Sequence, residues 1–75
     1  MNYRWEKDYR YYEAHLEHDL YDWVIIRTWG RKQTRMGRGM KVRIDSYQEG
    51  LEKLEQVKKR RRSRGYNLVW FVNYR

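Results

Sequence analysis

The chain has 75 residues, no cysteine, no proline and a formal net charge of +8. This length allows one small domain, near the lower limit at which a single core holds a fold. Without cysteine there is no disulfide framework or thiolate metal site, and no apolar run approaches the roughly 20 residues of a membrane span. The first six residues also lack the apolar stretch of a signal peptide, so we expect an intracellular, cytoplasmic protein without membrane contact.

The charge is unevenly distributed along the chain. Residues 1–25 hold three basic and six acidic groups, whereas residues 26–75 hold fifteen basic and four acidic groups. Such polarity is the electrostatic footprint of a protein that binds a polyanion, above all a nucleic acid. A basic chain that only avoids aggregation is the plainer alternative.

The N-terminal third predicts a short segment followed by a strand. Residues 1–8 show no clear periodicity, and we separate them from a domain at 9–75, expecting Tyr3 and Trp5 to pack back onto it. From Arg10 the chain alternates, which predicts a half-buried antiparallel strand. Residues 19–22 supply turn chemistry. The inward side of this strand is expected to carry Tyr12, Ala14 and Leu16, and the outward side Glu13, His15 and Glu17.

Residues 23–29 are β-branched and aromatic, which predicts a second strand paired with the first as a hairpin. Alternate side chains of a strand point to opposite faces. One face therefore carries Val24, Ile26 and Thr28, and the other carries Trp23, Ile25, Arg27, Trp29 and Arg31. If a helix covers the first face, Trp29 and its two arginines stand together on the second.

The middle of the chain predicts a basic loop and a third strand. Residues 30–39 hold three glycines together with Lys32, Arg35 and Arg38, and we expect a loop without strong secondary structure. Residues 40–45 alternate again. Met40, Val42 and Ile44 are expected to point inward, with Lys41 and Arg43 outward beside the second strand.

The C-terminal part predicts one helix and a final strand. Ser46 and Glu49 have the spacing of a capping box, which marks a helix start. The buried stripe is expected at Tyr47, Leu51, Leu54 and either Val57 or Lys58. Gly65 ends the helix, and residues 66–71, or a run on to Tyr74, form the last strand. The fold class is α+β, an antiparallel sheet of about four strands with one helix packed on one face.

The sequence resembles the WGR domain family over roughly residues 9–69. The resemblance is carried by Trp29-Gly30-Arg31, by Arg10-Tyr11-Tyr12, by residues 19–23, by Ile44-Asp45-Ser46 before the helix, and by Arg64-Gly65-Tyr66 after it. Residues 36–40 replace the family's usual Gly-x-Gly-Gln-like segment, and Lys32-Gln33 replaces its Ile-Gly. These departures concern the loop chemistry rather than the fold.

The resemblance implies a function in DNA binding. WGR modules occur inside poly(ADP-ribose) polymerases, where they help to bind DNA breaks, and in small bacterial proteins that stand alone. The matching tryptophan and arginine lie at the DNA-contacting end of the domain, which favours Trp29 and Arg31 as contacts.

The residues around Trp29 support the same interpretation. An indole offers a stacking surface for a sugar or base, glycine permits close approach of the backbone, and arginine supplies a planar fork for phosphate. The alternatives are core packing of Trp29 and pairing of Arg31 with Asp45 or Glu13. The candidate nucleic-acid-binding residues are Arg27, Trp29, Gly30, Arg31, Lys41, Arg43, Arg60, Arg61, Arg62, Arg64 and Tyr66.

Residues 58–64 carry six cations in seven positions. Their side chains are expected to point in all directions around the helix axis, so some should face the basic loop. About four phosphate contacts imply a slope of log affinity against log salt near −3 to −4. The alternative is a solvated helix end stabilised by the helix dipole.

We expect no enzyme, metal or cofactor. His15 and His18 lie among carboxylates, but residues three apart on a strand point to opposite faces and match no zinc spacing. There is no cysteine, the serines are the capping Ser46 and the helix-end Ser63, and there is no Walker-type glycine motif.

The sequence thus predicts a cytoplasmic module that binds nucleic acid, with DNA ends or breaks as the favoured target and association with the nucleoid as a further option. Contacts are expected to reach phosphate and sugar rather than base edges. The alternative is a protein-interaction or self-association module, with a protein partner or homo-oligomer formed through Trp23, Ile25 and Trp29.

Overall fold

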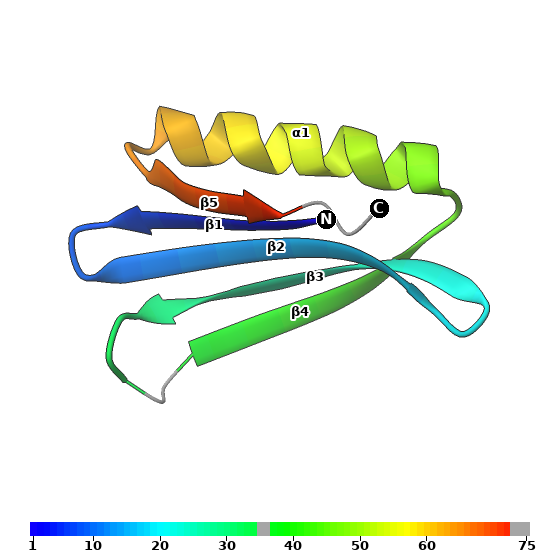
Figure 1. Cartoon of the computed structure of the whole chain (residues 1–75), viewed down its shortest axis with the longest axis horizontal. Coiled ribbons are helices and arrows are strands. Elements are labelled where there is room, and N and C mark those ends of the chain that lie inside the picture. Colours follow the sequence, from blue (N-terminus) through cyan, green and yellow to red (C-terminus); the bar gives the residue numbers. More distant parts are fainter. Residues whose placement is uncertain (35–36, 73–75) are drawn as a thin grey trace.

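The computed structural model of the chain describes residues 1–34 and 37–72. Arg35 of the expected basic loop, and Tyr74 as a possible end of the last strand, lie outside this part. The described elements are β1 (Asn2–Lys7), β2 (Arg10–Asp19), β3 (Asp22–Arg31), β4 (Gly37–Ile44), α1 (Tyr47–Ser63) and β5 (Asn67–Val72). They form an α+β domain in which α1 packs against a five-stranded sheet of order β4-β3-β2-β1-β5 (Figure 1). The predicted fold class is confirmed.

The strand beyond the expected four is β1, which lies inside the sheet. It pairs antiparallel with both β2 and β5. Its inward side chains, Tyr3 and Trp5, are buried and their rings stack at 5.4 Å. The segment at residues 1–8 is therefore part of the domain that we placed at 9–75. Only two inward residues alternate there with charged ones, which is too short a pattern to indicate a strand by itself.

The β2–β3 hairpin sets which side chains share a face. Tyr12, Ala14 and Leu16 are buried, as the alternation predicts. The turn leaves Asp19 paired with Asp22, and this register places Tyr12 opposite Trp29 and Leu16 opposite Ile25. Directly opposed residues of an antiparallel pair lie on the same face. Trp29 and Ile25 therefore share the face of β2 that is buried.

The segment between β3 and β4 is shorter than the expected loop. β3 continues to Arg31 and β4 begins at Gly37, with Gly30 paired to Gly37 across the two strands. Residues 30 and 37–39 therefore belong to strands. Glycine at position 37 permits a close approach, because a Cβ there would lie 2.8 Å from the Tyr11 hydroxyl.

The helix begins and ends at the predicted signals. The Ser46 hydroxyl accepts a hydrogen bond from the Glu49 amide at 3.1 Å, and the Glu49 carboxylate accepts one from the Asp45 amide at 2.7 Å. At the other end Gly65 has φ +85°, and the amides of Gly65 and Tyr66 donate to the carbonyls of Arg62 and Arg61. This is the Schellman arrangement, which glycine permits because it has no Cβ.

The inner face of α1 packs on β2, β3 and β4 through a narrow stripe. Leu54 is fully buried, and Leu51 and Val57 pack against the core. Gly50 brings the helix close to the sheet, since a Cβ there would lie 2.6 Å from a Leu16 methyl group. In Figure 1, β4 lies close to α1 at its Ile44 end and diverges from it toward its Gly37 end.

Candidate nucleic-acid interface

Trp29 lies on the face of the sheet that α1 covers. The condition that α1 covers the Val24, Ile26 and Thr28 face is not met. The physical reason is the register, because the buried side of β2 opposes Ile25 and Trp29. Arg27 and Trp29 do share one face, as predicted, but it is the face of the sheet on which α1 packs rather than the opposite face.

The Trp29 ring is half-buried at the margin of the core. It stacks on Tyr12 with ring centroids 5.9 Å apart and an interplanar angle of 13°. Tyr12 in turn meets Trp5 edge-on at 6.1 Å. The indole therefore packs against the core through one side and is still partly accessible. Trp29 thus has the packing role of the alternative interpretation and keeps a surface that a ligand can contact.

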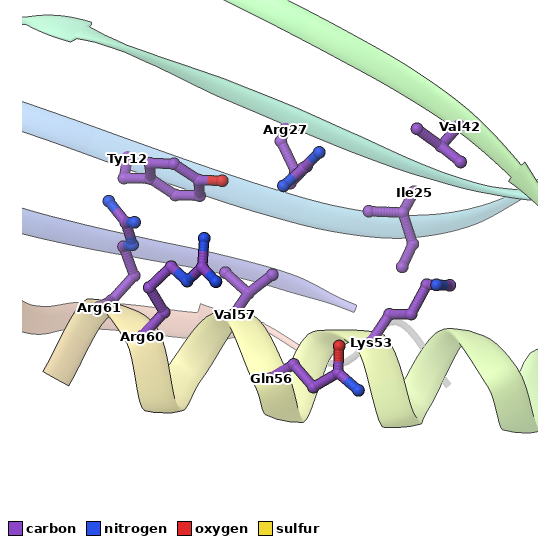
Figure 2. A pocket seen from close by; sticks show the side chains of 9 residues that line it. All are labelled: Tyr12, Ile25, Arg27, Val42, Lys53, Gln56, Val57, Arg60 and Arg61. Atoms are coloured by element: carbon purple, nitrogen blue, oxygen red, sulfur yellow. The ribbon is translucent and has the colours of Figure 1, made fainter. Parts of the chain in front are cut away.

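A groove opens between α1 and the β3–β4 hairpin, next to Tyr12. Its volume is about 460 Å³. Figure 2 shows Arg60 and Arg61 projecting from α1 toward the sheet, with Arg27 on the opposite wall. The nine lining residues are Tyr12, Ile25, Arg27, Val42, Lys53, Gln56, Val57, Arg60 and Arg61. None of them is acidic.

Arg61 is held between two tyrosine rings. Its guanidinium carbon lies 4.1 Å from the centroid of Tyr12 and 5.0 Å from that of Tyr66. Its Nε is buried and makes no hydrogen bond. Aromatic faces attract a cation but do not neutralise it. Tyr66, a candidate residue, therefore positions the Arg61 cation at the groove.

A second cluster of cations and aromatic rings lies at the end of β3. The guanidinium of Arg31 lies 5.0 Å from the ring centroid of Tyr9, and that of Arg10 lies 5.7 Å from it. Hydrogen bonding to Tyr9, with a smaller contribution from Tyr66, raises the pKa of Arg10 above its ordinary value. Arg31 stacks on Tyr9 and, among the described ion pairs, joins neither Glu13 nor Asp45.

Lys41 and Arg43 lie on the opposite face of the sheet. Their cross-strand partners are Ile26 and Val24, the residues that face away from α1. They point to the face opposite Met40, Val42 and Ile44, as predicted, but they do not join Arg27 and Trp29. Of the three residues expected to point inward only Ile44 is buried, because Met40 and Val42 are 47% and 38% exposed. A strand turns successive side chains to opposite faces, so a neighbour in sequence is not a neighbour on the surface.

The two faces differ in how their cations are compensated. On the open face Arg4 pairs with Glu13 at 2.7 Å, Lys32 with Glu6 at 3.1 Å and Lys41 with Asp19 at 2.7 Å. The Arg4 hydrogen bond, followed by that of Lys32, holds the pKa of Glu6 below its ordinary value, and the bond to Asp19 raises the pKa of Lys41. In the described part of the chain, the groove cations Arg27, Lys53, Arg60 and Arg61 form no ion pair.

The remaining candidates do not line the groove. Gly30 lies inside β3, with its backbone paired to Tyr11. Arg62 is exposed, and Arg64 caps the helix, where its carbonyl accepts a hydrogen bond from Lys7 Nζ at 2.7 Å. Only some of the 58–64 run therefore reaches the sheet side of the helix.

Sequence reasoning missed the helix residues Lys53 and Gln56. Lys53 lies seven residues and Gln56 four residues before Arg60, which places all three on one flank of the helix. Tyr12 was expected only as a core residue, yet its ring also forms a wall of the groove.

Other site types find no support in residues 1–34 and 37–72. No three His, Cys, Asp or Glu side chains there gather as a metal ion requires, and no helix there is long and apolar enough to cross a membrane. No protein-family model, curated protein or solved structure matches the chain.

Proposed function

We propose that this protein is a nucleic-acid-binding module of the WGR type, which holds DNA at an end or break through phosphate and sugar contacts. The single observation that carries this proposal is a group of four cations that form no ion pair within residues 1–34 and 37–72 and that lie beside the stacked Tyr12 and Trp29 rings. Unpaired arginines next to accessible aromatic rings suit phosphates that follow a sugar or base. Binding of this kind needs no catalytic group, and we propose that it takes place inside the cell, in the cytoplasm.

The contacts that we propose differ between the two faces. Arg27, Arg60 and Arg61 bind phosphates, and Trp29 packs against the terminal sugar. Arg31 extends the contact beyond the end of β3. Lys41 and Arg43 cannot reach the same phosphates from the other side of the sheet, so we assign them no contact with the DNA end.

Substitution of Trp29 tests the proposal. Stacking on an aromatic ring contributes about 1–3 kcal/mol, so Trp29→Ala should weaken binding of a duplex end roughly 5- to 150-fold. Since the ring also packs on Tyr12, Trp29→Ala will cost stability. Trp29→Phe keeps part of that packing and should weaken binding less. Fluorescence anisotropy of ended duplex, with closed circular duplex as competitor, measures both variants.

Two results would contradict the proposal. One is equal affinity of both folded Trp29 variants and the parent protein. The other is binding that does not weaken as salt rises, because contacts to phosphate release counterions and depend steeply on salt.

Self-association is a second candidate function, but on a different surface from the expected one. Ile25 is buried under α1, and Trp23 packs on Tyr47, so the expected Trp23, Ile25 and Trp29 face is not exposed as a patch. The exposed apolar surface is instead β5 at the sheet edge. Its residues Leu68, Val69, Trp70, Phe71 and Val72 are 39–52% exposed.

We propose that β5 pairs with β5 of a second copy. An edge strand presents unpaired backbone groups, and charged side chains are the usual protection against such pairing. β5 has no charge, whereas β4 at the other edge carries Arg38, Lys41 and Arg43. Sedimentation velocity in high salt should show a dimer that Val69→Lys dissociates. A monomer at all concentrations would contradict this candidate.

A further inference from the structure

The groove between α1 and β3–β4 combines two chemistries in one small volume. Its cations come from both walls, with Arg27 on β3 and Lys53, Arg60 and Arg61 on α1 (Figure 2). Its apolar surface comes from Ile25, Val42 and Val57. A ligand that satisfies both must carry an anionic group and an apolar, preferably flat, body.

The cations of the groove are held in place without an anion. Arg61 is fixed by the Tyr12 and Tyr66 rings. The shortest polar contact of Arg27 is to the Met40 sulfur at 2.9 Å, and a thioether is a weak acceptor. No residue that lines the groove is acidic, and none of the described ion pairs includes a groove cation, so a phosphate can bind these donors without displacing a carboxylate partner.

The apolar wall suits a nucleobase. Ile25 and Val57 lie toward the core, and Val42 stands at the mouth, where it is 38% exposed. The Gln56 amide at the rim can donate to and accept from the polar edge of a base. Inorganic phosphate would leave the apolar wall uncovered, and an uncharged apolar ligand would leave the cations without a partner.

The size of the groove fits one nucleotide. Pockets that enclose small ligands have volumes of about 300–1,000 Å³, and this groove has about 460 Å³. A base inside a duplex must leave its stack before it can enter such a pocket, which costs least when it is already unpaired. The groove therefore favours an unpaired nucleotide over a paired one.

We infer that the groove takes the unpaired terminal nucleotide of a strand. The phosphates of this nucleotide and of its neighbours along the strand lie among Arg27, Arg60 and Arg61, and the base lies on Ile25, Val42 and Val57. This inference rests on the proposed function and makes it narrower, because it selects strand ends with an overhang. Trp29, which stacks on Tyr12 at the groove wall, then contacts the next sugar along the strand.

Three ligands test whether the bound nucleotide belongs to a strand end or is free in solution. They are a blunt duplex, the same duplex with a one-nucleotide overhang, and a free nucleoside monophosphate. The overhang should bind at least fivefold more tightly than the blunt end, from the lower limit of base stacking. The free nucleotide should compete only at far higher concentration, because it lacks the contacts of the adjoining duplex. Equal binding of free nucleotide and overhang would overturn the assignment to a strand end.

Variants that fill the groove test its location. Val42→Phe adds bulk at the mouth from the sheet, and Gln56→Trp adds it from the exposed helix rim, where folding is not at risk. Each should bring the ratio of overhang to blunt affinity close to one. Ile26→Phe makes a comparable change on the open face and should preserve the ratio of the parent protein. Circular dichroism melting confirms that each variant is folded.

The outcomes distinguish the inference from the proposed function. Blunt and overhang duplexes that bind equally to the parent protein would overturn the inference and leave DNA binding standing. An overhang preference that survives in both groove-filling variants would overturn the placement in the groove. If the parent protein binds neither the blunt duplex nor the overhang duplex, the proposed function itself is overturned.

Discussion

Removal of one groove cation should change the salt dependence of binding, whereas removal of a matched cation on the other face should not. Arg27→Gln deletes a guanidinium that faces the groove and whose polar contact is to the Met40 sulfur. Arg43→Gln makes the same substitution on β4, where the side chain is exposed on the open face. Both variants should fold, because neither arginine has an ion-pair partner among the described pairs.

The magnitude follows from the number of cations. Each neutralised phosphate contributes about −0.9 on duplex DNA and about −0.7 on a single strand to the slope of log affinity against log salt. Four groove cations therefore give a slope of about −3 to −4, and Arg27→Gln should make it shallower by roughly 0.7–0.9. The lost charged hydrogen bond contributes about 1.5 kcal/mol or more, which corresponds to a roughly tenfold loss of affinity.

Anisotropy titrations of an ended duplex between low and physiological salt measure both quantities. The reasoning would be refuted by an unchanged slope in Arg27→Gln, or by equal effects of the two substitutions. The second result would mean that DNA senses only the net charge of the protein rather than the position of the cations in the groove.

Two further predictions concern stability. Gly50→Val should destabilise the fold by about 2 kcal/mol, because a Cβ at position 50 would lie 2.6 Å from a Leu16 methyl and 2.7 Å from one of Ile44. This loss corresponds to a fall in melting temperature of roughly 8–16 °C. The control is Glu52→Val on the exposed flank of the helix, and an equal fall in both variants would contradict the prediction. Glu6 contributes stability above its unfolded pKa that is lost as pH falls through its lowered folded pKa, so the free energy of unfolding should decrease below about pH 4.5. In Glu6→Gln this decrease should be smaller in urea titrations at pH 7 and pH 3, and an identical decrease in both proteins would show that the Arg4 and Lys32 contacts do not contribute.

Much of the fold could be predicted because its signals are local. Alternation along β2, the capping box at Ser46 and the glycine after α1 each depend on residues a few positions apart. These signals determine where elements begin and end and which side chains share a face. They do not indicate a strand as short as β1, whose place in the sheet depends on β5 at the far end of the chain.

The sequence analysis left open which face of β3 is covered by α1, and the reason can be identified. Both faces of β3 carry aliphatic side chains, so the composition of β3 alone does not decide between them. The predicted turn at 19–22 contained the missing information, because pairing of Asp19 with Asp22 brings Leu16 opposite Ile25 and Tyr12 opposite Trp29. Buried residues on β2 then require that Ile25 and Trp29 face the helix.

The site could be predicted only as far as residue types allow. Trp29, Arg27 and the arginines at the end of α1 were recognised from charge and aromatic content. Their arrangement depends on where a helix crosses a sheet, which sequence spacing does not give. Lys53 and Gln56 were missed for this reason, and Lys41 and Arg43 were grouped with Arg27 although the sheet separates them.

The indole resonances of the tryptophans test most directly which face binds nucleic acid. Trp29 stands beside the groove, whereas Trp70 pairs with Arg4 and lies on the open face. During an NMR titration with a short overhang duplex, the Trp29 indole N–H should shift and that of Trp70 should stay in place. A shift of Trp70 with Trp29 unchanged would place the nucleic acid on the open face and contradict the account.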